Sequence, residues 1–279
     1  MLKIRSWLRR YNQLLGFGVV AISMIINALI SMPGFGWLLT GAFFLLVNLH
    51  VIPQYWARLF VRTKNFTCQR NYALPFEGKW TVYAGGTTPA LSAGWGELIT
   101  RYTYYFSQVD EAGETNLSPG KNILAAADGT VVKIINQHPD TPKSEEAAAD
   151  VTGTAHLFGN QIIIRHGKGE YSCTAGLRLN SITVKVGDTV RQGDVIAQCG
   201  SSGYMTGEAC VQFHLQTGRG FGASASLPVA FTNIHAEPSA AFILAHKKEG
   251  VQCPSTDGNL RVVGDKIFIG RGLDVGNIR

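Results

Sequence analysis

The segment 181–203, SITVKVGDTVRQGDVIAQCGSSG, constrains the fold of this chain more than any other part of its sequence. Its apolar residues are mostly valine and isoleucine, which favour β-strands. Two dipeptides, Gly187-Asp188 and Gly193-Asp194, separate these apolar residues. Glycine and aspartate favour tight turns, so the segment predicts two short strands joined by turns in a small all-β domain.

Two apolar runs near the N-terminus, residues 14–31 and 37–52, predict a membrane anchor. As helices, both are just long enough to cross a hydrocarbon core of roughly 30 Å, so we expect a two-helix transmembrane hairpin. Lysine and arginine flank the pair on both outer sides and are absent from its loop. The positive-inside rule then places both ends in the cytoplasm. If one run were re-entrant or interfacial, the following domain would lie outside the cytoplasm.

The net charge of +6 belongs to the N-terminal part of the chain. Residues 1–70 contain eight Lys or Arg and no acid, which leaves 17 basic against 19 acidic residues in the remainder. We therefore expect a lipid bilayer as a partner and no nucleic acid. The five cysteines are an odd number without CxxC spacing, which favours buried free thiols over a zinc ribbon or a complete disulfide framework.

Alternating apolar residues and turn dipeptides predict further strands after the anchor. The expected elements are an edge strand at 78–83, a strand at 101–109, a strand–turn–strand at 123–137, a hairpin of 161–166 with 171–175, a last core strand at 211–217, a helix at 239–246 and a hairpin around 257–268. The polar, acidic residues 138–153 read as a surface insertion.

Six segments in this order resemble the lysostaphin-like (LytM-type) zinc metallopeptidases, in particular their membrane-anchored members. They are WTVYAGGTTPALS, RYTYYFSQVDEAG, ILAAADGTVVKI, GNQIIIRHGKGEYS, the segment 181–203 and FHLQTG. The resemblance covers roughly residues 76–235. It implies a mainly β fold, an antiparallel LytM-like core of the duplicated hybrid-motif type with a narrow groove. Active members cleave peptide cross-bridges of bacterial cell walls, which implies a bacterial inner (cytoplasmic) membrane and, against the charge pattern, an extracytoplasmic domain.

The expected organisation has four parts. They are a transmembrane hairpin at 1–56, a linker at 57–75, the peptidase-type domain at 76–235 and a C-terminal extension at 236–279.

The resemblance also implies which residues would hold zinc and move protons. Zinc in such a site needs three protein ligands and an open position for water. The family's ligand positions carry Ala93, Tyr105 and His214 here, and its two assisting histidines are replaced by Gly176 and Gln212. A methyl group cannot bind metal, and a phenol with an unperturbed pKa near 10 is a poor ligand at neutral pH. The resemblance therefore implies a degenerate, inactive member without zinc, with His214 as a relic ligand.

Two alternatives concern this zinc site. An ungapped count from Gly203 places the family's His-x-His motif near 209–211 and retains neither histidine. A metal site made of Cys173, Cys210 and His214 is a further possibility, although no ligand spacing supports it.

Aromatic residues near these positions are candidates for a peptide-binding groove, although aromatic strand residues also pack in cores. The candidate groove residues are Trp95, Tyr102, Tyr104, Tyr105, Gln212 and His214. Together they favour a binding, scaffolding or regulatory module whose partner is a protein or a cell-wall peptide.

Two other functions stay open. One is an active zinc metalloendopeptidase with a rearranged site that uses His214 and a Cys or Asp. The other is a biotinyl- or lipoyl-like barrel or membrane adaptor. The turn at 198–205 lacks the attachment lysine of a carrier, and 138–153 is too short for the helical hairpin of an adaptor.

Overall fold

The computed structural model describes residue 41 and residues 66–113, 116–140, 158–203, 209–220, 224–248 and 259–278. The chain divides into two compact units, Met1–Phe60 and Val61–Arg279, and the second is described here by itself. Both predicted membrane spans, apart from residue 41, lie outside the described residues. Within the described ranges, no helix has the length and apolar character needed to cross a bilayer.

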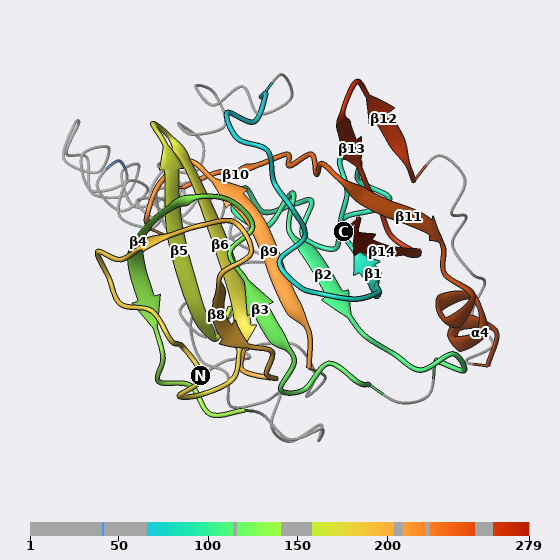
Figure 1. Ribbon diagram of the computed structural model, residues 1–279. Helices are drawn as coiled ribbons and strands as arrows, with labels where there is room; N and C mark the ends of the chain where they lie inside the picture. Colours follow the sequence, from blue (N-terminus) through green and yellow to red (C-terminus); the bar gives the residue numbers. More distant parts are fainter. Residues whose placement is uncertain are drawn as a thin grey trace, which may run out of the picture. The chain divides into compact units, whose positions relative to one another are not determined.

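A large antiparallel sheet forms the centre of the second unit (Figure 1). Its strands in spatial order are β11 (Ile234–Pro238), β14 (Leu273–Asn277), β1 (Trp80–Ala84), β2 (Tyr104–Ser107), β9 (Val211–Gln216), β6 (Glu170–Leu177), β5 (Asn160–Gly167), β4 (Gly129–Ile135) and β7 (Thr189–Val190), and β10 (Ser226–Leu227) pairs with β9. These antiparallel pairings confirm the mainly β fold predicted from the sequence.

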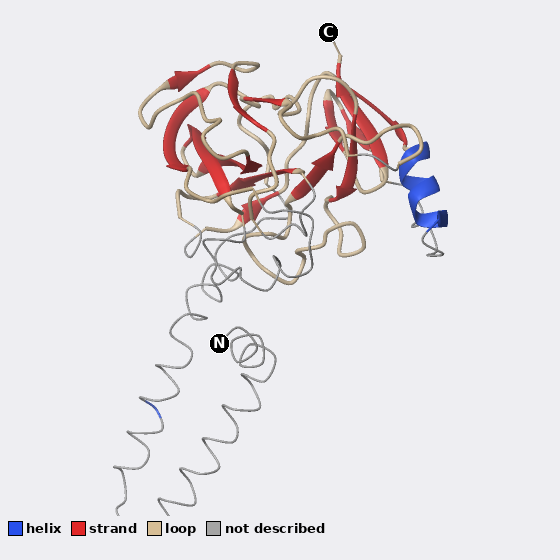
Figure 2. Cartoon of the chain, turned by 90° about the horizontal axis from the view of Figure 1, so that it is seen from below, coloured by secondary structure: helices blue, strands red, loops and turns tan. Residues whose placement is uncertain are grey.

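Two small sheets and a helix complete the described elements. The sheets pair β3 (Asn122–Leu124) with β8 (Val195–Gln198) and β12 (Arg261–Val263) with β13 (Lys266–Phe268), and the helix is α4 (Ala240–Lys248). Figure 2 shows how far strands dominate these residues, with α4 at one end of them.

Successive side chains of the central strands point alternately to the two faces of the sheet, and one of these faces packs against the main hydrophobic core. On β9, Val211, Phe213 and Leu215 point into the main hydrophobic core, and on β2 Tyr104 and Phe106 do the same. Complete burial of side chains of this size contributes roughly 1.5–3 kcal/mol each. The intervening residues of these strands must therefore face the other side of the sheet, where the candidate site lies.

Several predicted elements are confirmed. The hairpin at 161–175 is β5 with β6, the strand at 211–217 is β9, the helix is α4 and the C-terminal hairpin is β12 with β13. Cys173, Cys199 and Cys210 are buried free thiols, Cys68 is a half-buried one, and Cys253 lies outside the described residues.

Other predictions about strand pairing were wrong. The strand at 78–83 is not an edge, because β14 pairs with the side of β1 that β2 leaves free. The predicted strand–turn–strand at 123–137 is confirmed as β3 and β4, which do not pair with each other, since β3 pairs with β8 and β4 pairs with β5 and β7. Strand β9 is not the last core strand, since β10, β11 and β14 join the same sheet.

The opening segment 181–203 also differs in detail from its prediction. Its strands are shorter than expected, only β7 and β8, and residues 181–186 are not in a strand. Ile182 and Val184 pack at the margin of the main core instead. Of the predicted insertion, residues 141–157 are outside the described ranges, and His138 is buried.

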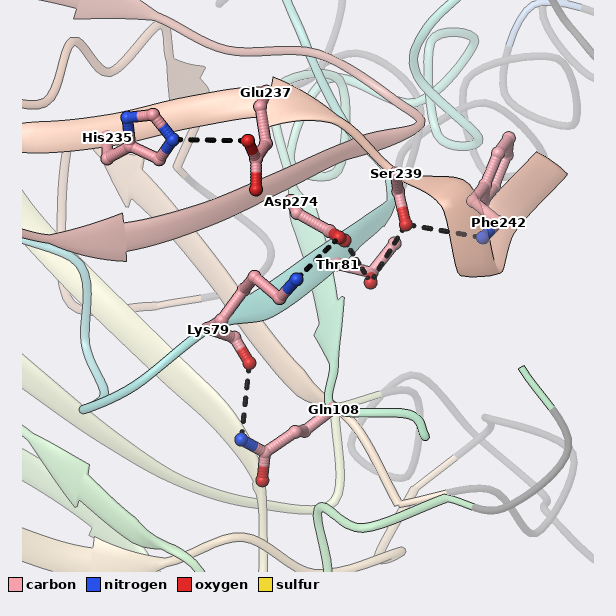
Figure 3. A network of polar contacts seen from close by, with 8 residues as sticks. All are labelled: Lys79, Thr81, Gln108, His235, Glu237, Ser239, Phe242 and Asp274. Atoms are coloured by element: carbon pink, nitrogen blue, oxygen red, sulfur yellow. Dashed lines mark hydrogen bonds and ion pairs between the residues drawn. The ribbon is translucent and has the colours of Figure 1, made fainter. Parts of the chain in front are cut away.

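Segments on both sides of residues 76–235 contribute to the same core. Tyr72 and Leu74, from the expected linker, are buried in it, and β14 of the expected extension is an interior strand. Figure 3 shows the polar contacts that join this extension to β1. Thr81 Oγ1 donates to Asp274 Oδ1 at 2.6 Å, and Lys79 Nζ lies 3.5 Å from Asp274 Oδ2. Ser239 Oγ, 3.4 Å from Thr81 Oγ1, caps α4 by accepting from the Phe242 backbone N–H at 3.2 Å.

Candidate functional site

Strands β2, β9 and β6 bring the predicted site residues together on the face opposite the main core. Tyr105 and Ala175 lie on either side of Gln212, and Cys173 lies opposite His214. The structure therefore places Tyr105, Gln212 and His214 in one neighbourhood.

The imidazole of His214 is completely buried and neutral. Its Nε2 lies 3.0 Å from Oε1 of Gln216, whose Nε2 in turn donates to the Gly218 carbonyl at 2.6 Å. This orientation makes Gln216 Oε1 the acceptor, so the imidazole proton is on Nε2 and Nδ1 is an acceptor without a partner. The Phe158 ring lies with its centroid 5.2 Å from that of His214. Burial lowers the pKa of His214 to about 4, because the charged form would lose its hydration.

Neighbouring groups that could bind metal are protonated or neutral. Burial raises the pKa of the Cys173 thiol to about 12, and the thiol donates to Oε1 of Gln161 at 3.3 Å. Burial, with a smaller effect from Cys210, raises the pKa of Tyr105 to about 12. The Gln212 amide is buried, and its Nε2 has no hydrogen-bond partner. None of these groups carries a negative charge at neutral pH.

Gly176 has a structural reason for lacking a side chain. It lies where the pairing of β5 and β6 shifts register, and its φ of 75° is in the left-handed region. A Cβ at this position would collide with the carbonyl oxygen of Cys210. The local backbone conformation is therefore unfavourable for a histidine, or for any residue with a Cβ, at this position.

The remaining predicted residues do not join this neighbourhood as a group. Ala93 is exposed in the turn-rich segment between β1 and β2. Trp95 is half-buried, with its ring edge-on to that of Tyr102 at 5.7 Å. Tyr104 faces the main core and donates its hydroxyl to the Ile269 carbonyl at 3.0 Å, so it does not line the site.

Sequence reasoning named Cys173 but missed the other apolar residues that fill this face. A second hydrophobic cluster, separate from the main core, consists of Ile99, Phe158, Ile163, Cys173 and Ala175. Phe158 precedes β5 and carried no motif that would indicate contact with His214. Gln216 could have been found, because strand alternation puts it on the same face as Gln212 and His214.

The residues present do not fit a zinc ion. Zinc requires three ligands, whereas this face offers one free imidazole nitrogen beside a protonated thiol, a protonated phenol and an amide. Across the described ranges, no group of three or more His, Cys, Asp or Glu is arranged to hold a metal.

Comparisons with known proteins place this face in a recognised domain. Residues 111–221, which include Gly176, Gln212 and His214 but not Ala93 or Tyr105, match the model of peptidase family M23. A comparison with curated proteins gave no match.

Solved structures with similar folds have low sequence identity to the chain. A mutant catalytic domain of the prophage-encoded M23 protein EnpA from Enterococcus faecalis is 16% identical, with a TM-score of 0.37 over 56% of this chain and 94% of that one. The catalytic domain of lysostaphin from Staphylococcus simulans is 20% identical, with a TM-score of 0.32 over 53% and 86%. The SpoIIQ–SpoIIIAH pore-forming complex contains a chain that is 15% identical, with a TM-score of 0.37 over 57% and 89%. Residues 111–221 are therefore similar to the peptidase M23 (LytM-type) domain, and this similarity rests on the match of the family model.

Proposed function

We propose that this chain is a membrane-anchored M23-type protein that binds a protein or peptide without cleaving it. The observation that carries the proposal is the state of His214. Its imidazole is completely buried beside Phe158, with a pKa lowered to about 4 by that burial. A metal ligand in a hydrolytic site must instead face an open position that water and substrate can reach.

This face lacks the residues that a zinc peptidase uses to hydrolyse a peptide bond. A zinc peptidase needs a metal-bound water whose pKa is lowered, and a base that takes its proton. Gly176 has no space for a base, and Gln212 cannot act as one at neutral pH. An M23 frame without these groups retains its strands and loops, which can still recognise a partner.

The nature of the partner depends on the side of the membrane. The charge pattern around the predicted spans favours a cytoplasmic domain, which would meet proteins but not assembled cell wall. Of the predicted groove residues, Trp95 and Tyr105 are half-buried, so part of each side chain is exposed and can contact such a partner. A domain on the outer side would instead meet cell-wall peptides.

A cleavage assay tests the absence of activity. The purified full chain, with and without added zinc, is incubated with cell-wall cross-bridge peptides, and products are measured by mass spectrometry. We expect no cleavage in either case. Cleavage that a chelator abolishes would contradict the proposal.

An active zinc peptidase with a rearranged site is the second candidate, because Cys173 lies directly opposite His214 on the neighbouring strand. Its thiol, with a pKa raised to about 12 by burial, would have to lose its proton to bind zinc. If this candidate holds, Cys173→Ser and His214→Ala each abolish a chelator-sensitive activity of the wild-type chain.

A further inference from the structure

We propose that one face of the second unit, where the chain enters it, lies against anionic lipid headgroups. This entry face consists of residues 66–70, the turn between β5 and β6, and the β12–β13 hairpin. Figure 1 shows residue 66 and the residues after it, the β5–β6 turn and the β12–β13 hairpin along the same upper side of the second unit. The inference rests on the proposed membrane anchor and adds a second contact with the bilayer.

Hydrogen bonds hold the three parts of the entry face together. Gln69 Nε2 donates to the Lys168 carbonyl in the β5–β6 turn at 3.2 Å, and Arg70 Nε donates to the His166 carbonyl at 3.2 Å. From the hairpin, Lys266 Nζ donates to the Cys68 carbonyl at 3.3 Å.

The buried carboxylate of Glu170 fixes the entry segment. It accepts the Gln69 backbone N–H at 2.9 and 3.2 Å and the Tyr72 hydroxyl at 2.7 Å. The Glu170 side chain is completely buried, and these donors stabilise its carboxylate, so this acid is not exposed on the entry face.

The entry face gathers cations that are far apart in the sequence. Arg70, Lys168, Arg261 and Lys266 are all on it, and the first three are exposed. Among the described residues, the ion pairs join Lys79 with Asp274 and His235 with Glu237, and neither pair includes one of these four cations. The Arg261 guanidinium carbon lies 4.2 Å from the centroid of the Phe268 ring, so this cation also makes a cation–π contact.

Exposed acids also lie near this face. They include Asp265, in the hairpin turn, and Asp128 and Asp194, whose carboxylates accept the backbone N–H groups of Gln192 and Arg191 at 2.8 and 2.7 Å. The four cations outnumber these three carboxylates, two of which accept backbone N–H groups, and a net positive surface attracts anionic lipid.

Exposed valines lie between two of these cations. Val262 and Val263 are 59% and 54% exposed, and Arg261 and Lys266 flank them on the hairpin. An apolar pair bordered by cations fits the boundary between headgroups and acyl chains, where valine leaves water and the cations stay with phosphate.

The length of chain before the entry face sets an upper limit on its distance from the second predicted span. Thirteen residues, 53–65, separate the second predicted span from the first described residue of the unit. Fully extended, they reach at most about 45 Å. They include Arg58, Arg62 and Lys64 and no acid, so the attraction to anionic lipid continues from the span to the entry face.

Hydrogen exchange of the full chain in nanodiscs tests this inference. Discs of neutral phosphatidylcholine are compared with discs that also contain phosphatidylglycerol, at low and high salt. We expect residues 166–170 and 260–266 to exchange at least several-fold more slowly in the anionic discs at low salt. High salt should remove the difference, because it screens exposed charges.

The test variant combines Lys168→Glu with Arg261→Glu. The matched control combines Lys185→Glu with Lys247→Glu, which changes two other exposed residues and alters the net charge by the same amount. The test pair should abolish the lipid-dependent protection and the control pair should keep it. A single Lys168→Glu change, on an exposed turn, replaces the pair if the pair does not fold.

The possible failures are distinguishable. If the chain enters neutral discs but shows equal exchange in both lipids, the entry face does not bind headgroups and the inference is overturned, while the anchor stands. Protection that is independent of lipid charge and of the substitutions would show a protein contact at the hairpin edge instead, which also overturns it. A chain that does not enter neutral discs at all contradicts the anchor itself.

Discussion

At the scale of single residues, substitution of Gly176 tests whether the local backbone tolerates a side chain. Gly176→Ala should lower the free energy of unfolding by about 2 kcal/mol or more, since it combines an unfavourable φ with a collision at the Cys210 carbonyl. Gly169→Ala is the control, because its φ of 71° is similar but a Cβ there meets no atom within 4 Å. Denaturant unfolding of both variants separates the two causes. Equal losses would show that the collision is absent.

The buried imidazole of His214 predicts a pH dependence of stability. Its pKa is about 4 in the folded chain, against 6.5 as the ordinary value, so between these pH values the unfolded chain binds more protons. Stability from this group is therefore full above pH 6.5 and is lost as pH falls toward 4. The loss is about 2 kcal/mol at pH 5.

The contribution of His214 is measured by denaturant unfolding of the wild-type chain and of His214→Gln at pH 7 and pH 5. His166, whose pKa burial also lowers, is present in both proteins and cancels in the comparison. The wild type should lose about 2 kcal/mol more than the variant. An equal loss in both would mean that His214 is not buried.

The sequence alone showed which residue occupies each candidate site position, but it did not show what surrounds that residue in the folded chain. The replacements at Gly176 and Gln212 were visible because a missing side chain is a fact of sequence. The collision at Gly176 was not visible, because it depends on the carbonyl of a residue on another strand. The contact of Phe158 with His214 also joins residues 56 positions apart, which no local pattern reports.

At the scale of elements, the C-terminal strand depends on the polar network around Asp274 (Figure 3). Asp274→Ala should destabilise the chain by about 1.5–3 kcal/mol, because the buried Thr81 hydroxyl loses a charged acceptor. Glu237→Ala, which removes an ion pair with His235 on exposed side chains, should cost about 0–1 kcal/mol. Thermal or denaturant unfolding compares the two, and a larger effect at Glu237 would contradict the role assigned to Asp274.

Strand positions could be predicted from alternation, and strand partners mostly could not. A period of two identifies a strand such as β1 but does not say what lies beside it. The neighbour of β1 is β14, nearly two hundred residues later, and this long-range pairing turned an expected edge into an interior strand. The β5–β6 hairpin was predictable because its partners adjoin one another across a short turn.

At the scale of the whole molecule, the predicted hairpin of two spans implies a cytoplasmic C-terminus. A reporter that is active only in the cytoplasm, fused after residue 279, should therefore be active, and one that needs export should be silent. The opposite pattern would contradict the two-span prediction and make cell-wall peptides the reachable partners.

The zinc content of the purified full chain tests the central claim most directly. Elemental analysis compares the wild type, His214→Ala and the matched control His235→Ala, which changes a histidine on the exposed ion pair. Because one neutral, buried imidazole cannot hold zinc alone, all three proteins should contain far less than one zinc per chain. One zinc per chain in the wild type and in His235→Ala, lost in His214→Ala, would contradict the account and restore a metallopeptidase site.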